Sequence, residues 1–160
     1  MLSRKKFIAL AATGSLATLF GQTPQPKKPK GDPLPGELVK EWVSKAHSDF
    51  ARVQELFVQE PQLLNASWDW GGGDFETALE AAGHVGNREI AEFLLAKGAR
   101  MNIFCAAMLG RLDIVKAVLQ AYPELKHSAG PHGLKLIHHA NKGGDAAKKV
   151  LKYLQKIGAD

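Results

Sequence analysis

Three stretches of this chain share one internal spacing, and that spacing constrains the fold more than any other feature of the sequence. Each stretch runs nine residues to a closing glycine, with an apolar residue two positions in and Ala five positions in: Thr77 to Gly86, Met101 to Gly110 and Lys135 to Gly144. An amphipathic run follows each closing glycine. The pattern predicts antiparallel helix pairs, joined by tight turns, that bury their apolar stripes by stacking on one another.

Local signals agree with this prediction. Thr77 and Glu80 have the spacing of a capping box, so a helix is expected to open at Thr77. Asn87 is a candidate N-cap for the following helix. The tight turns favour a positive φ, which is easily adopted by the closing glycines, Gly86, Gly110 and Gly144.

Residues 77–99 read TALEAAGHVGNREIAEFLLAKGA. This segment resembles the ankyrin repeat, whose pattern TPLHxAAxxGHxxIVxxLLxxGA recurs about every 33 residues. Weaker matches cover 101–119 and 133–160, and a degenerate first unit runs from about residue 37 to 64. The resemblance implies an all-α, ankyrin-type α-solenoid of about four helix-turn-helix repeats over residues 36–160, with degenerate terminal repeats. It also implies a non-catalytic module that binds another protein through its concave helix face and inter-repeat loops.

The sequence departs from a regular repeat in two places. Gly86 and Gly110 are 24 residues apart, whereas Gly110 and Gly144 are 34 apart, so the third unit has lost its hairpin finger. Conversely, residues 65–76 form a long Gly-rich loop with two Trp and a Phe. Because aromatic side chains dominate interface energetics, we expect the partner there. The predicted partner-binding residues are Trp68, Asp69, Trp70 and Asp74, with His84 and His132 nearby; each Trp could instead fold back over the helix ends.

A histidine-rich segment supports a competing hypothesis. His127, His132, His138 and His139 lie within thirteen positions, so a small-ligand or metal-binding protein using residues 127–139 is the alternative function. Two observations weigh against a metal there. His138 and His139 are adjacent on a helix and diverge by about 100°, and no Cys is nearby. The primary prediction therefore contains no metal and no cofactor.

Composition and motifs argue against other classes of function. No phosphate loop, GxSxG or HExxH motif is present, which predicts that the protein is not an enzyme. Glu76 and Glu80 are four apart, but capping accounts for Glu80. Without residues 1–22 the net charge falls from +5 to +2, and basic residues alternate with acidic ones, which argues against nucleic-acid binding. Cys105, the single cysteine, is expected to be a small buried hydrophobe.

The N-terminus predicts export. Residues 1–22 combine a basic start with a short apolar segment, as in a signal peptide, and SRKKFI resembles the twin-arginine signal with Lys5 in place of the second Arg. Residues 23–35 hold five prolines and read as an extended linker. We expect a monomer in the periplasm or outside the cell, with no stable membrane insertion once the signal is removed.

Overall fold

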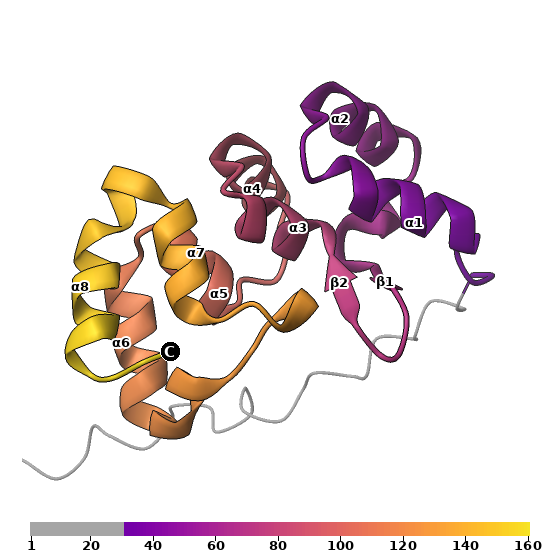
Figure 1. Cartoon of the computed structure of the whole chain (residues 1–160). Coiled ribbons are helices and arrows are strands. Elements are labelled where there is room, and N and C mark those ends of the chain that lie inside the picture. The colour runs from indigo at the N-terminus through magenta and orange to yellow at the C-terminus, as the bar shows by residue number, and fades with distance from the viewer. Residues whose placement is uncertain (1–30) are drawn as a thin grey trace, which may run out of the picture. The chain divides into compact units, whose positions relative to one another are not determined.

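The computed structural model describes residues 31–160, and Pro33–Asp160 form one compact unit. The predicted signal peptide and residues 23–30 of the predicted linker lie outside the described residues. The described part is mostly helical (Figure 1), with these α-helices: α1 Gly36–Lys45, α2 Phe50–Gln59, α3 Ala78–Val85, α4 Arg88–Ala96, α5 Ile103–Met108, α6 Leu112–Ala121, α7 Leu136–Lys142 and α8 Lys148–Lys156. Short 3-10 helices complete it: η1 Pro61–Asn65, η2 Pro123–His127, η3 Pro131–Gly133 and η4 Gly144–Ala147.

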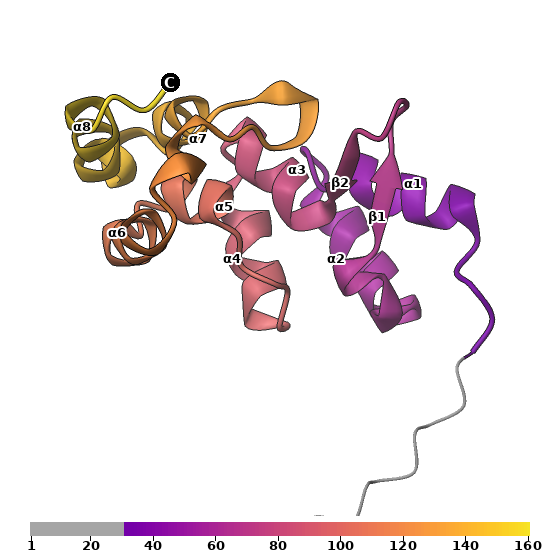
Figure 2. The same cartoon turned by 90° about the horizontal axis from the view of Figure 1, so that it is seen from below.

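Helices that follow one another along the chain pack as pairs. α1 contacts α2, α3 contacts α4, α5 contacts α6 and α7 contacts α8. The first members of the pairs also contact one another, in the order α1, α3, α5, α7, and α3 touches α7 directly (Figure 2). Segments distant in sequence are therefore brought together along this row of first helices.

The predicted local signals are confirmed in the helix ends and turns. Thr77 and Glu80 form a complete capping box at the start of α3. The Asn87 side chain accepts a hydrogen bond from the Ile90 N–H at the start of α4 (3.2 Å). The closing glycines all have positive φ: Gly86 at 84°, Gly110 at 76° and Gly144 at 58°. Gly144 also begins η4, which is followed directly by α8 at Lys148.

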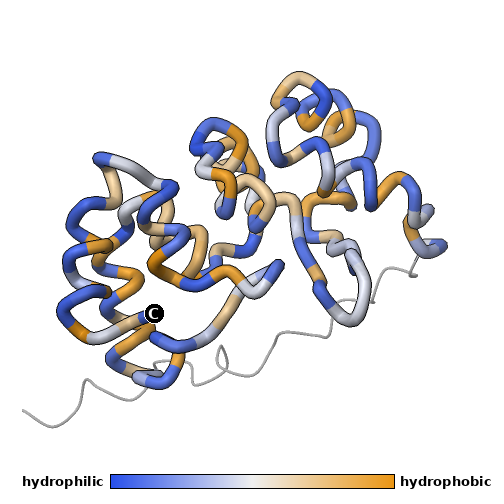
Figure 3. Tube along the Cα trace, viewed as in Figure 1, coloured by the Kyte–Doolittle hydropathy of each residue, from blue (hydrophilic) through white to orange (hydrophobic). Residues whose placement is uncertain are grey.

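Buried apolar side chains form two clusters, one in each half of the unit. The first includes Trp42, Leu56 and Leu94, and the second includes Val115, Leu136 and Leu154. Along each helix, orange hydrophobic stretches alternate with blue hydrophilic ones (Figure 3), as expected for helices that bury one face. No helix among the described residues is both long enough and apolar enough to cross a membrane.

The aromatic segment 65–76 is more ordered than the predicted loop. It contains a two-stranded antiparallel hairpin, β1 Ser67–Asp69 and β2 Phe75–Thr77, in which Trp68 lies opposite Glu76. The turn between the strands uses Gly71, Gly72 and Gly73 at positive φ, and Asp69 Oδ1 accepts the N–H groups of Gly71 (2.9 Å) and Gly73 (3.1 Å). The segment therefore forms a short hairpin where a loop was predicted, because the three glycines adopt positive φ and Asp69 caps the turn.

Candidate metal centre

A fully buried carboxylate lies on the second strand of the hairpin. Glu76, in the middle of β2, is 0% exposed. Strand alternation explains its burial, because Glu76 and its partner Trp68 share the face toward α1, whereas Phe75 and Asp69 are exposed. A carboxylate taken out of water is destabilised unless other groups compensate it, so its neighbours are informative.

Three histidine rings approach Glu76 from three separate segments. His47 follows α1, His84 lies in the last turn of α3, and His132 lies in η3, between α6 and α7. Together with Glu76 they form what we call the Glu76 cluster. Each member offers one ligand atom, and these four atoms lie within 4.8 Å of one another. Residues 85 positions apart in the sequence therefore meet at one point.

The distances within the Glu76 cluster are short. His84 Nε2 lies 2.9 Å from Glu76 Oε1 and 3.0 Å from His47 Nε2. His132 Nε2 lies 3.5 Å from Glu76 Oε1, and His47 Nε2 lies 3.6 Å from Glu76 Oε2. All three histidines thus present the same nitrogen, Nε2, to the carboxylate.

Hydrogen bonds on the far side of two rings fix which nitrogen carries the proton. His47 Nδ1 lies 3.1 Å from Val43 O and 3.0 Å from Ser44 O. His132 Nδ1 lies 2.7 Å from Asp74 Oδ2. Carbonyl and carboxylate oxygens only accept, so Nδ1 must donate in both rings. When these rings are neutral, Nε2 carries no proton and its lone pair is directed into the cluster. This is the tautomer in which a histidine binds a metal through Nε2.

Glu76 itself is only partly satisfied. Trp70 Nε1–H donates a hydrogen bond to Oε2 (2.8 Å), but no described residue forms a well-oriented hydrogen bond to the buried Oε1. Burial opposes ionisation of Glu76. The contacts with His84, Trp70 and His47 together outweigh burial and lower the pKa of its carboxyl. An ionised oxygen without a well-oriented donor, facing the Nε2 atoms of His84 and His132, is a site for a cation.

Four of the six predicted partner-binding residues meet at or beside the Glu76 cluster. His84 and His132 are members, Trp70 donates to Glu76, and Asp74 binds His132. These four predicted positions are thus close together, with Trp70, His84 and His132 directed at the Glu76 carboxylate and Asp74 directed at His132.

The other two predicted residues lie outside the cluster. The Trp68 ring is half-buried, rests near Gly36 and lies under the Lys40 ammonium at 5.7 Å, so this Trp does fold back. The Asp69 side chain builds the hairpin turn.

The 127–139 segment contributes a single ligand. His127 Nδ1 pairs with Asp160 Oδ1 at 2.8 Å, His138 Nε2–H donates to His84 O at 2.9 Å, and His139 Nδ1–H donates to Lys135 O at 2.9 Å. His139 is buried, and its burial lowers its pKa to about 4. Of the four histidines in this segment, the structure brings His132 to the Glu76 cluster, where its co-ligands come from distant parts of the chain.

Sequence reasoning missed His47 and Glu76. His47 stands in the degenerate first unit, where no motif marks it. Glu76 directly precedes the capping residue Thr77 and stands in a hairpin strand, so the one available signal was an acidic residue at a position that strand alternation would bury. Recognising that signal required knowing that residues 67–77 form a hairpin.

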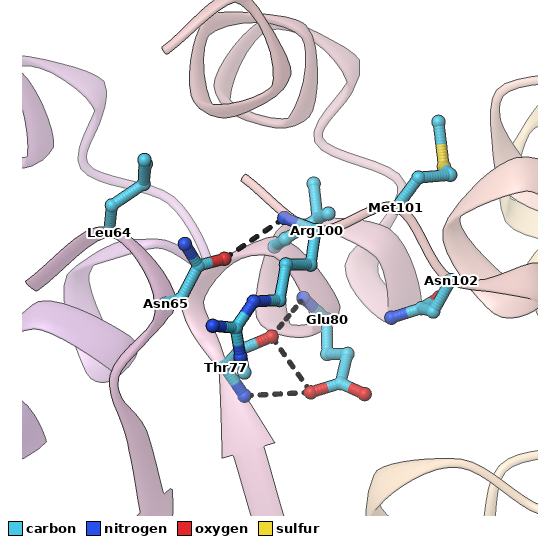
Figure 4. Close-up of a pocket in the computed structure, with 8 residues that line it drawn as sticks. Leu64, Asn65, Thr77, Glu80, Arg100, Met101 and Asn102 are labelled. Atoms are coloured by element: carbon cyan, nitrogen blue, oxygen red, sulfur yellow. Dashed lines mark hydrogen bonds between the residues drawn. The ribbon is translucent and has the colours of Figure 1, made fainter. Parts of the chain in front are cut away.

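A surface hollow that includes Thr77 in its lining is less suited to a ligand than the Glu76 cluster. It has a volume of about 220 Å³ and is lined by Leu64, Asn65, Thr77, Leu79, Glu80, Arg100, Met101 and Asn102. Figure 4 shows that much of its polar lining is already used in the fold. Asn65 accepts the Arg100 N–H (2.9 Å), Thr77 and Glu80 form the capping box, and Asn102 caps α5.

The single thiol takes no part in the Glu76 cluster. Cys105 is buried in α5, and burial raises its pKa to about 12, which keeps it protonated at neutral pH. The candidate ligands in the described chain are therefore imidazole and carboxylate groups.

No protein-family model matches this chain, and no curated protein matches it significantly.

Proposed function

We propose that this protein binds a divalent metal ion, and that zinc is the ion best suited to its site. The observation that carries the proposal is the convergence of the three histidine Nε2 atoms on the buried carboxylate of Glu76. Imidazole and carboxylate oxygen are both common zinc ligands, and a set of three histidines and one carboxylate completes four-coordination.

The spacing of the ligand atoms supports tetrahedral zinc. With bonds of roughly 2.0–2.1 Å, the ligands of a tetrahedral zinc ion lie about 3.3 Å apart. Between members of the Glu76 cluster the distances are 2.9, 3.0 and 3.5 Å, with 3.6 Å from His47 to the other carboxylate oxygen. All four ligand atoms lie within 4.8 Å of one another, so the more distant rings would have to move closer together to place all four ligands around one ion.

The ligand count favours a structural or regulatory ion over a catalytic one. Catalytic zinc sites usually keep one position open for water or substrate, whereas four protein ligands close the coordination sphere. His47, Glu76 and His84 come from the first half of the unit, and His132 comes from the loop before α7. The ion would thus join the two halves, and the protein is proposed to be a non-enzyme.

A zinc titration of the full chain tests this function. Metal-free protein is titrated against a chromophoric zinc chelator, and we expect one zinc per chain at micromolar or lower free zinc. His84→Ala should lose this binding, because the His84 Nε2 atom is close to both Glu76 and His47.

His127→Ala is the matched control, since His127 pairs with Asp160 outside the cluster. It should bind zinc like the wild type. Absence of stoichiometric binding by the wild type, or equal binding by His84→Ala, would overturn the proposed function.

We also propose, as a second function, a protein-interaction module built as an ankyrin-type stack, exported to the periplasm or beyond and monomeric. Support comes from the paired helices and from the exposed aromatic edge of the hairpin, where Phe75 is 59% and Trp70 37% exposed. Phe75→Ala should abolish partner capture in a pull-down from a periplasmic fraction. Val58→Ala, at another exposed apolar side chain, should not.

A further inference from the structure

The ligand His132 has the most constrained backbone in the Glu76 cluster. Among residues 31–160 it is the one non-glycine residue with positive φ (φ 59°, ψ 19°). L-residues with a Cβ atom rarely adopt this left-handed conformation, and it persists where surrounding contacts enforce it. His132 is also the ligand carried by a connection between helices, so its position depends on what holds that connection.

The Asp74 carboxylate binds both the backbone and the ring of His132. The His132 backbone N–H donates to Asp74 Oδ1 (2.8 Å), and its ring Nδ1–H donates to Asp74 Oδ2 (2.7 Å). Backbone and ring are thus fixed by a single side chain 58 positions earlier in the sequence. With Nδ1 tied to Asp74, the opposite nitrogen, Nε2, faces Glu76 Oε1.

Asp74 is in turn fixed by the hairpin. Trp70 N–H donates to Asp74 O (3.0 Å) and Asp74 N–H donates to Gly71 O (3.3 Å), which closes the turn. Asp69 Oδ1 accepts the N–H groups of Gly71 and Gly73 and holds the same turn from inside. The hairpin therefore presents two carboxylates: Glu76, in the middle of β2, faces the cluster, and Asp74, at the end of the turn, binds the far side of His132.

From this arrangement we infer that Asp74 is a positioning residue for the metal, acting through His132. The inference rests on the proposed metal-binding function. A carboxylate that accepts the outer N–H of a ligating histidine fixes its tautomer and its ring direction, and removing it typically weakens metal binding about 10–100-fold. The hairpin thus orients the ligand that lies in the connection before α7.

Asp74→Asn is the first test. Asparagine keeps an oxygen for the His132 backbone N–H but replaces the acceptor of Nδ1–H with an NH₂ donor. Zinc affinity of the full chain, measured by chelator competition, should fall about 10–100-fold. Asp160→Asn is the matched control, because it breaks a similar pair with His127 away from the cluster and should leave zinc affinity unchanged.

A double-mutant cycle distinguishes positioning from general disruption of the hairpin. If Asp74 acts through His132, the double variant Asp74→Asn/His132→Ala should bind zinc as weakly as His132→Ala alone. The inference fails if Asp74→Asn binds zinc like the wild type, or if it lowers affinity by the same factor in the His132→Ala background.

A measurement without metal separates this inference from the proposed function. Long-range ¹H–¹⁵N spectra at pH 8.5, where histidine is ordinarily neutral, should show His132 as the Nδ1–H tautomer in the wild type. Asp74→Asn should shift it toward Nε2–H. An unchanged tautomer overturns the positioning role even if the wild type binds zinc. A wild type with the expected tautomer but no zinc binding overturns the metal function, and the role in metal binding with it.

Discussion

The histidines of this chain fall into two groups that differ in their spacing along the sequence and in what they contact in the structure. His47, His84 and His132 are far apart in sequence and meet at Glu76. His127, His138 and His139 are near one another in sequence, but the structure gives each a different oxygen partner: Asp160 Oδ1, the His84 carbonyl and the Lys135 carbonyl. Closeness in sequence therefore did not identify the candidate ligands. The candidate ligands are identified by the buried carboxylate that they share, because a metal ion needs converging lone pairs and a compensating negative charge.

The largest effect should come from removing that carboxylate. Glu76→Gln takes away the one anionic ligand, so zinc affinity should fall by more than the roughly 100-fold upper range for residues outside the coordination sphere. Isothermal titration calorimetry would measure the loss. Comparable zinc binding by Glu76→Gln would mean that the buried carboxylate is not what distinguishes the two histidine groups.

Zinc bound by His47, His84, His132 and Glu76 should also stabilise the fold. A ligand that binds only the native state adds about 2.7 kcal/mol to the free energy of unfolding when its free concentration is about 100 times Kd. For a unit of this size the melting temperature should rise on the order of 10 °C. Calorimetry with and without zinc measures it. A rise of the same size in His84→Ala would assign the stabilisation to another site.

In the second group, His139 should make stability depend on pH. Its pKa is about 4 in the fold, against an ordinary 6.5, because burial disfavours the charged ring. Below the ordinary pKa the unfolded chain takes up a proton that the native state does not, so stability falls as the pH drops from about 6.5 toward 4. The loss between pH 7 and pH 5 should be about 2 kcal/mol.

Urea denaturation at the two pH values tests this loss. His139→Leu cannot take up the proton and should reduce the difference. The experiment is done without zinc. If zinc were bound, protonation of its ligands at low pH would weaken binding and lower the stability for a second reason. A pH dependence equal to the wild type in His139→Leu would contradict the assignment to His139.

A smaller effect is expected at Trp70. Trp70→Phe keeps an aromatic ring but removes the N–H that binds Glu76 Oε2 at 2.8 Å. Because this bond orients a ligand from outside the coordination sphere, zinc affinity should fall about tenfold. Trp68→Phe is the comparison, since Trp68 packs beside Gly36 and Lys40 and should leave zinc affinity unchanged. Equal losses in both variants would point to the hairpin as a whole.

Much of the helical framework could be predicted from the sequence because its signals are local. The capping box at Thr77 and the cap at Asn87 involve groups three residues apart, and turn glycines such as Gly86 and Gly110 act through their own φ. The hairpin was missed, although its Trp, Asp and Gly residues drew attention to the segment. Each strand has three residues, and so few residues do not show a recognisable alternation of apolar and polar side chains in the sequence.

The candidate site was decided by tertiary structure. The sequence alone determined that several histidines, an aromatic Gly-rich segment and stackable helix pairs are present. It could not show that the end of α1, strand β2, the end of α3 and the connection before α7 converge, because that depends on how the helix pairs pack. A ligand set requires atoms within a few ångströms of one point, and packing brought His47 and His132 there from 85 positions apart.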